Sequence, residues 1–318
     1  MTTTAPAQST AKRMSIGSVK RAAPTKTFRV LLYGTEGVGK STFAAGAPAP
    51  VFIAPSKAIE QLGVDAFPQP TSAREIREAI AELENGKHDY RTLVIDELGW
   101  VEQTIWTQVC AAEGVASIEK FEFGRGYAAA FEIWRTILAD LERLQTKRGM
   151  HVVLLGHAEV KRFNDPQLGA EYDRFRVLLH EKSSGLLRQW VAAVLFARYE
   201  LHSQGKREKN RALSDGSRVI HCEWSPAFDA KNRYGLPATL PLSWEEFAAA
   251  ASGGSTDEAT AAIARIAELR ASLAGHLDEG KFAAALKAAG TDRRELVKLA
   301  DMLETKAARI ASPTTATT

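Results

Sequence analysis

The sequence predicts an α/β protein built on a mostly parallel sheet with helices on both faces. Short apolar runs rich in strand formers alternate along the chain with segments of helical periodicity, which is the pattern of parallel sheets covered by helices. The length of 318 residues exceeds that of a usual single domain, so we expect one large domain with an appendage.

Strands are expected where apolar runs are short and end at chain breakers. Six segments have this character: 28–34, 51–54, 92–96, 151–156, 192–200 and 219–224. Helical periodicity is clearest over 71–85 and 127–148. Residues 201–218 are polar and charged, which predicts a hairpin tip or a mobile loop.

Composition divides the chain into five segments. They are a disordered basic tail (1–26), the α/β core (27–250), a linker (251–255), a C-terminal helical region (256–311) and a disordered tail (312–318). The helical region carries apolar residues at helical spacing, at Ile263, Ile266, Leu269 and Leu273. This spacing is typical of packed helices or of a partner-binding element.

Several classes of protein are excluded. Two cysteines, Cys110 and Cys222, cannot build a disulfide framework and fit a reducing cytoplasm. No apolar run reaches the roughly 18 residues of a membrane span, and the first 26 residues lack the apolar centre of a secretory signal. We therefore expect a cytoplasmic protein without a membrane partner. The cysteines and histidines also lack zinc-ligand spacing.

One glycine-rich segment predicts a phosphate-binding loop. Residues 34–41 fit the pattern G-x-x-x-x-G-K-[ST] between a strand and a helix, a context that disfavours a chance glycine-rich turn. Lys40 is expected to reach the β and γ phosphates of ATP, and the Ser41 hydroxyl to coordinate Mg²⁺. The candidate nucleotide-binding residues are Gly34, Thr35, Glu36, Gly37, Val38, Gly39, Lys40, Ser41 and Thr42.

An acid on a neighbouring strand completes such a site. Asp96 ends the apolar run 92–96 and is the candidate to hold Mg²⁺. Glu97 follows directly, and two roles are open for it. It either polarises the attacking water as a catalytic residue or caps the next helix as a solvent-facing side chain.

Beyond these motifs, the order of the segments resembles the RecA-like ATPases, in particular phage-encoded ATP-binding proteins of the single-strand-annealing recombinase type. The resemblance covers roughly residues 27–247 and rests on segments 33–42, 123–144, 156–200 and 228–237. It implies a RecA-like P-loop core and an ATP-dependent role in DNA recombination inside a bacterial host. The implied partners are single-stranded DNA and further copies of the chain in a ring or helical filament, and a single-strand-binding protein is a further candidate.

The resemblance also assigns roles to three side chains. His157 takes the place of the polar γ-phosphate sensor, the alternative being a satisfied histidine at a strand end. Lys231 and Arg233 lie in the segment KNRYG, which resembles the KNRFG signature of RadA-type proteins. There the two cations reach the nucleotide of a neighbouring subunit, so an oligomer completes the site. A solvated basic loop is the alternative.

The sequence departs from the family at the glutamate that activates water. The expected position holds Ser56, and Glu60 follows four residues later. Either Glu97 has taken the role, or hydrolysis is slow and ATP serves mainly as an assembly switch. Binding of ATP is therefore the firmer expectation, and ATPase activity depends on Glu97.

Two segments are candidates for binding single-stranded DNA, 113–126 and 158–176. Their cations can follow a phosphate backbone, and their aromatic rings can stack on bases. The candidates are Lys120, Phe123, Arg125, Lys161, Arg162, Phe163, Arg174 and Arg176. Acidic residues interleave in the second segment, so a nearly neutral surface loop is an equal alternative.

The expected function is ATP-dependent DNA recombination through single-strand annealing or strand exchange. A nucleotide-gated assembly protein without a DNA role is one alternative, and a P-loop kinase acting on a small molecule is another. The KNRYG segment and the lack of an obvious arginine-rich lid argue against the kinase.

Overall fold

The fold is seen in a computed structural model that describes residues 27–165, 170–200, 202–204, 211–213, 216–289 and 293–311. The two tails expected to be disordered lie outside these residues. Within them, no helix combines the length and apolarity needed to cross a lipid bilayer.

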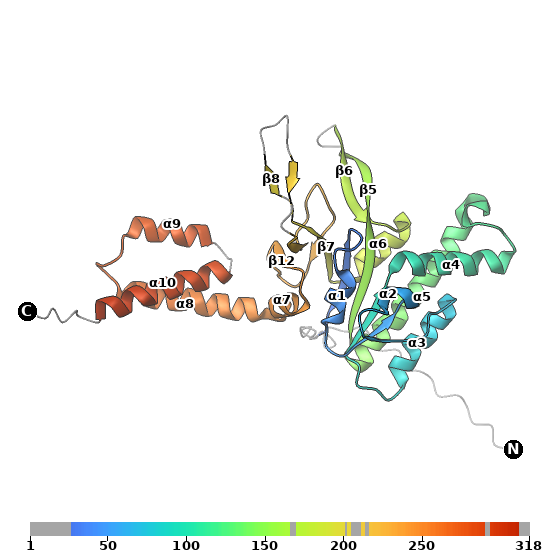
Figure 1. The fold of residues 1–318 in the computed structure, drawn as a ribbon, viewed down its shortest axis with the longest axis horizontal. Coiled ribbons are helices and arrows are strands. Elements are labelled where there is room, and N and C mark those ends of the chain that lie inside the picture. Colours follow the sequence, from blue (N-terminus) through green and yellow to red (C-terminus); the bar gives the residue numbers. More distant parts are fainter. Residues whose placement is uncertain are drawn as a thin grey trace, which may run out of the picture.

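A mixed sheet forms the centre of the molecule (Figure 1). The strand order is β12-β10-β7-β1-β5-β4-β2-β3; the strands from β7 to β3 run parallel, and β10 and β12 add an antiparallel edge. The strands are β1 (Arg29–Gly34), β2 (Pro50–Ile53), β3 (Asp65–Ala66), β4 (Thr92–Asp96), β5 (His151–Asp165), β6 (Ala170–Val177), β7 (Ala193–Tyr199), β8 (His202–Gln204), β9 (Arg211–Leu213), β10 (Arg218–His221), β11 (Lys231–Asn232) and β12 (Thr239–Pro241). All six predicted strands are present.

Helices cover both faces of this sheet. In β1, Leu31 and Tyr33 pack beneath α3 to α6, whereas Val30 and Leu32 pack against α1 and α7 on the other face. Because the strand is buried on both sides, its sequence is an uninterrupted apolar run. The helices are α1 (Lys40–Ala45), α2 (Ser56–Ile59), α3 (Ala73–Asn85), α4 (Leu98–Glu113), α5 (Arg125–Arg148), α6 (Glu181–Trp190), α7 (Trp244–Ala249), α8 (Ser255–Ser272), α9 (Glu279–Ala289) and α10 (Arg293–Ala311). The predicted α/β class is confirmed.

The segment expected as a surface loop at 158–176 is instead a β-hairpin. β5 continues beyond the sheet and pairs with β6, with Arg162 opposite Asp173 and Glu159 opposite Arg176. Arg162 also forms an ion pair with Glu171 at 2.8 Å. Two of the cations in this segment thus face carboxylates across the strands, whereas Lys161 stands opposite Arg174.

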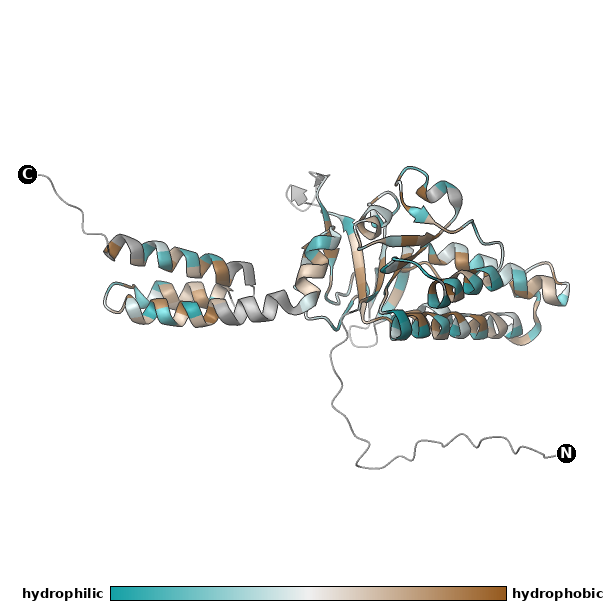
Figure 2. Ribbon diagram, turned by 90° about the horizontal axis from the view of Figure 1, so that it is seen from below, coloured by the Kyte–Doolittle hydropathy of each residue, from teal (hydrophilic) through white to brown (hydrophobic). Residues whose placement is uncertain are grey.

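The C-terminal helices form a small core of their own. Ile266, Leu273 and Leu296 are buried together, and Ile263 is half-exposed. Figure 2 shows α8, α9 and α10 as a helical group beside the sheet domain. Residues 251–255, expected as a linker, continue the helical path from α7 through a π-helical turn (η4, Ala250–Gly254) into α8. Alanine, the best helix former, precedes the glycines there.

Candidate functional site

The loop after β1 has the backbone of a phosphate-binding loop. Gly37 and Gly39 have φ values of 69° and 102°, which side chains rarely adopt. Gly34 lies so close to β7 that a Cβ atom would stand 2.2 Å from the carbonyl oxygen of Ala197. Glycine is therefore required where the sequence pattern has it, and helix α1 starts directly after the loop, at Lys40.

Lys40 is a buried cation held by the loop itself. Its Nζ donates to the carbonyl oxygens of Gly34 at 3.2 Å and Thr35 at 2.9 Å. The same Nζ lies 3.4 Å from Nδ1 of His157. Burial lowers the pKa of Lys40. A phosphate group beside this ammonium would replace the favourable interactions with water that the ammonium loses on burial.

Ser41 and Asp96 form the pair needed for a magnesium ion. The Ser41 hydroxyl donates to the Asp96 carboxylate at 2.5 Å, which joins α1 to the end of β4. Asp96 is buried, and this burial raises its pKa. A hydroxyl and a carboxylate oxygen are ligands that Mg²⁺ accepts in nucleotide sites. The residues present therefore fit ATP with Mg²⁺.

His157 connects the lysine to Glu97. Its Nε2 lies 3.7 Å from a carboxylate oxygen of Glu97, and its Nδ1 faces Lys40. Glu97 is the N-cap residue of α4, yet its side chain makes no capping hydrogen bond. This geometry favours the first of its two predicted roles. Glu60, in contrast, is exposed at the end of α2.

The sheet explains why these residues meet. β5 lies between β1 and β4, and the register places His157 beside Gly34 and Leu155 beside Asp96. Asp96 at the end of β4, His157 within β5 and the loop after β1 therefore converge at one edge, where ligands bind in such sheets. Residues predicted from separate segments come together in one site: Lys40, Ser41, Asp96, Glu97 and His157.

The KNRYG segment lies at the opposite edge of the sheet. β11 pairs with the first residues of β7, so that Lys231 stands opposite Val194. The Lys231 Nζ donates to three carbonyl oxygens at the end of α6, at 2.6–3.1 Å. Burial and the neighbouring cations Arg233 and Arg29 lower the pKa of Lys231. Arg233 itself is exposed.

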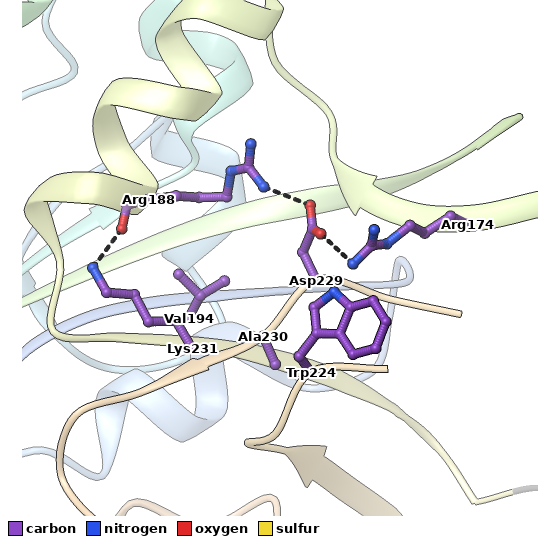
Figure 3. A pocket seen from close by; sticks show the side chains of 7 residues that line it. All are labelled: Arg174, Arg188, Val194, Trp224, Asp229, Ala230 and Lys231. Atoms are coloured by element: carbon purple, nitrogen blue, oxygen red, sulfur yellow. Dashed lines mark hydrogen bonds and ion pairs between the residues drawn. The ribbon is translucent and has the colours of Figure 1, made fainter. Parts of the chain in front are cut away.

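A pocket of ≈ 310 Å³ lies beside Lys231 (Figure 3). In it the Asp229 carboxylate accepts from Arg174 at 2.7 Å and from Arg188 at 2.8 Å, and Arg176 lies 3.7 Å away. Arg174 is buried between the rings of Phe163 and Trp224. The structure thus places Arg174 in an internal ion-pair cluster, whereas Lys161 and Arg162 lie exposed on the hairpin.

The other DNA candidates lie between α4 and α5. Lys120 and Arg125 are exposed, and the Phe123 side chain is 98% exposed on a residue with a φ of 54°. This left-handed backbone is uncommon for a phenylalanine, and the ring gains nothing from packing. The exposed ring and the two cations have the composition of a surface on which bases can stack.

Two further side chains border the phosphate loop, and no motif in the sequence points to them. The Tyr199 hydroxyl, at the end of β7, donates to the carbonyl oxygen of Gly37 at 3.0 Å. Arg218, on β10, lies over the Tyr199 ring at 5.7 Å. A Cβ atom on Gly39 would lie 2.8 Å from Nη1 of Arg218.

Comparisons with known proteins agree with the P-loop core. A family model described as an AAA domain matches residues 26–234, which is most of the sheet domain. No curated protein matches the chain. Among solved structures, the RadB recombinase matches with 15% identity and a TM-score of 0.34, covering 61% of this chain and 81% of that one. At these values the likeness carries no functional argument. The sheet and the family match together confirm the expected α/β class with a mostly parallel central sheet and an AAA-type ATPase domain.

Proposed function

We propose that this chain, which belongs to the AAA domain family, is an ATP-dependent DNA recombination protein of the phage type. In this proposal it binds single-stranded DNA as an oligomer and promotes annealing or strand exchange. The nucleotide, the DNA and the neighbouring copy each use a different part of the sheet domain.

The phosphate loop and the carboxyl ends of the neighbouring strands would hold ATP and Mg²⁺. The amide groups of residues 36–41 and the Lys40 ammonium suit the phosphates, because the loop glycines free the backbone to turn inward. Ser41 and Asp96 would hold Mg²⁺, which neutralises charge on the phosphate oxygens when bound. In this proposal Glu97 orients and deprotonates a water molecule, which is supported by Nε2 of His157 lying 3.7 Å from its carboxylate.

The single observation that carries the DNA role is the continuity of β5. The strand runs without a break from His157, beside Lys40, into the hairpin that presents Lys161 and Arg162. A γ-phosphate that shifts His157 would therefore bias the strand that carries the cations. This gives nucleotide state a direct mechanical route to DNA affinity.

The place of KNRYG supports assembly. From Val30, which pairs with the start of β7, to Gly34 is about 13 Å at the usual rise of a strand. The backbone of Lys231 therefore lies far from the phosphate loop of its own chain, and its Nζ is bound at the end of α6. A copy stacked head to tail would bring the exposed Arg233 to its neighbour's phosphate loop, and Lys231 would join it by releasing its carbonyl partners at the end of α6. Such contacts produce rings or helical filaments.

The test is a DNA-binding titration in low salt. With a non-hydrolysable ATP analogue and Mg²⁺, the protein should bind a labelled single-stranded oligonucleotide at least tenfold more tightly than without nucleotide. Lys40→Ala should lose this difference, because the loop no longer holds the phosphates. Equal DNA affinity with and without the analogue would contradict the proposal.

A second function is favoured by the hairpin charges. Arg162, Arg174 and Arg176 all face carboxylates, so few hairpin cations are left for a phosphate backbone. In this reading the protein is a nucleotide-gated assembly protein without a DNA role. It predicts ATP-dependent oligomers in light scattering together with an absence of DNA binding at any nucleotide state.

A further inference from the structure

We infer that Tyr199, Arg218 and Leu242 form a nucleoside wall, the surface that holds the base end of the bound nucleotide. This inference rests on the proposed nucleotide binding and assigns residues that neither the motifs nor the family match indicates. All three contact or border the phosphate loop.

Close contacts define the wall. Tyr199 is tied to the loop through its hydroxyl, and Arg218 covers its ring. Leu242 approaches the same glycine as Arg218, since a Cβ atom on Gly39 would lie 3.6 Å from its Cδ2. The register pairs Arg218 with Tyr199 across two strands, and the Leu242 amide donates to the Arg218 carbonyl at 3.0 Å. These backbone pairings fix the positions of the three residues relative to one another.

The strand order decides which end of a nucleotide the wall would meet. Asp96 and His157, on β4 and β5, lie to one side of β1, and they define the side of Mg²⁺ and the γ-phosphate. Tyr199 and Arg218, on β7 and β10, lie to the other side of β1. A triphosphate running along the loop between the two sides has its nucleoside at the second one.

The chemistry of the wall fits a base. A planar guanidinium over a phenol ring offers a flat, polarisable surface, and a leucine adds apolar contact. Arg218 is exposed and, among the described residues, makes neither an ion pair nor a side-chain hydrogen bond. Its planar face is thus available for stacking on a base as well as for cation–π contact.

The test compares three ligands with Mg²⁺: ATP, ADP and inorganic tripolyphosphate, measured by calorimetry. Arg218→Ala should weaken ATP and ADP by the same factor of about ten, the size expected for one lost stacking contact. Tripolyphosphate, which has no base, should bind unchanged. Arg218→Lys should not restore ATP binding, because it keeps the charge and loses the plane. The matched control is Arg91→Ala, which removes an exposed cation just before β4, at the amino ends of the parallel strands.

Several results would overturn the inference. If Arg218→Ala loses more affinity for ATP than for ADP, Arg218 contacts the γ-phosphate and not the base. If it loses as much affinity for tripolyphosphate, Arg218 acts only through its positive charge. No loss at all, with Lys40→Ala still losing every ligand, would also overturn the nucleoside wall and leave the proposed function intact. A wild-type protein that binds none of the three ligands would overturn the proposed function itself.

Discussion

The two edges of the parallel sheet hold their lysines in different ways. At the carboxyl edge, Lys40 lies beside His157 on β5 and interacts electrostatically with Asp96 at the end of β4, so its neighbours include ionisable groups. At the amino edge, Lys231 donates to three backbone carbonyls at the end of α6. Carbonyl oxygens at the end of a helix attract a cation and, unlike His157 and Asp96, do not themselves bind or release protons.

This difference separates what one chain can do alone from what it can do only with a neighbour. The carboxyl edge brings a complete set of phosphate and Mg²⁺ candidates together within one copy. The amino edge presents Arg233 to solvent and gives Lys231 a structural task in its own chain. We therefore expect changes at the first edge to affect chemistry, and changes at the second to affect stability and assembly separately.

The largest effect is expected at Glu97. Glu97→Gln keeps the size of the side chain but cannot take a proton, so ATP turnover should fall by roughly 10²–10⁴. Nucleotide affinity should change little. Steady-state phosphate release and nucleotide titrations measure the two quantities.

Glu60→Gln is the matched control for that experiment. Glu60 is the other acid near the position where the resemblance to RecA-like ATPases implies a glutamate, but it is exposed at the end of α2. Its replacement should leave turnover unchanged. If Glu60→Gln loses turnover and Glu97→Gln keeps it, the role of Glu97 is wrong.

A smaller effect is expected from Lys40→Ala. The variant removes charge-assisted contacts worth about 1.5–3 kcal/mol each, so ATP affinity should fall by roughly 10- to 100-fold. Fluorescent-nucleotide binding measures it, and Lys57→Ala on the exposed surface of α2 is a suitable control. Unchanged ATP affinity in Lys40→Ala would remove the distinction between the two edges.

At the amino edge, the two cations should separate in a stability measurement. Lys231→Ala loses the contacts to α6 and should lower the free energy of unfolding by about 1–3 kcal/mol. Arg233→Ala should stay within about 0.5 kcal/mol of the wild type, because the side chain is exposed. In light scattering, both should need a higher protein concentration than the wild type to form ATP-dependent oligomers. Equal stability of the two variants would contradict the claim that Lys231 stabilises the end of α6.

The smallest effect concerns Asp96 and pH. Burial raises its pKa, so the folded state favours the protonated carboxyl. The stabilisation is full below the ordinary pKa and is lost as pH rises through the raised value. Asp96→Asn stays neutral, and it should melt a few degrees above the wild type near about pH 7.5, the gap closing toward about pH 4. Melting curves without nucleotide test this, and a lower midpoint for the variant at the higher pH would contradict it.

Features of the fold could be predicted where the sequence pattern that specifies them lies within a few neighbouring residues. The strand 92–96 and the loop 34–41 were predictable because periodicity and glycine spacing lie within a few residues. The hairpin of β5 and β6 was not, since alternating charges in one segment fit a loop as well as a paired strand. Only the pairing with β6 decides between them.

The site shows the same limit. Lys40 and Asp96 belong to recognisable motifs, and the resemblance to RecA-like ATPases singles out His157, so their meeting could be expected. Arg174 carries a plausible DNA signal, but its pairing with Asp229 links residues far apart in the chain and cannot be read from either segment. Arg218 approaches the loop only because β10 pairs with β7.

The central claim is that two neighbouring copies share one site, and mixing two inactive variants tests it most directly. Lys40→Ala lacks a working loop, and Arg233→Ala lacks a working neighbour cation. In a 1:1 mixture, random assembly gives about a quarter of interfaces an intact loop and an intact cation. The account predicts that ATPase activity returns to about a quarter of the wild-type rate. A mixture that forms oligomers and yet stays as inactive as its two components would contradict it.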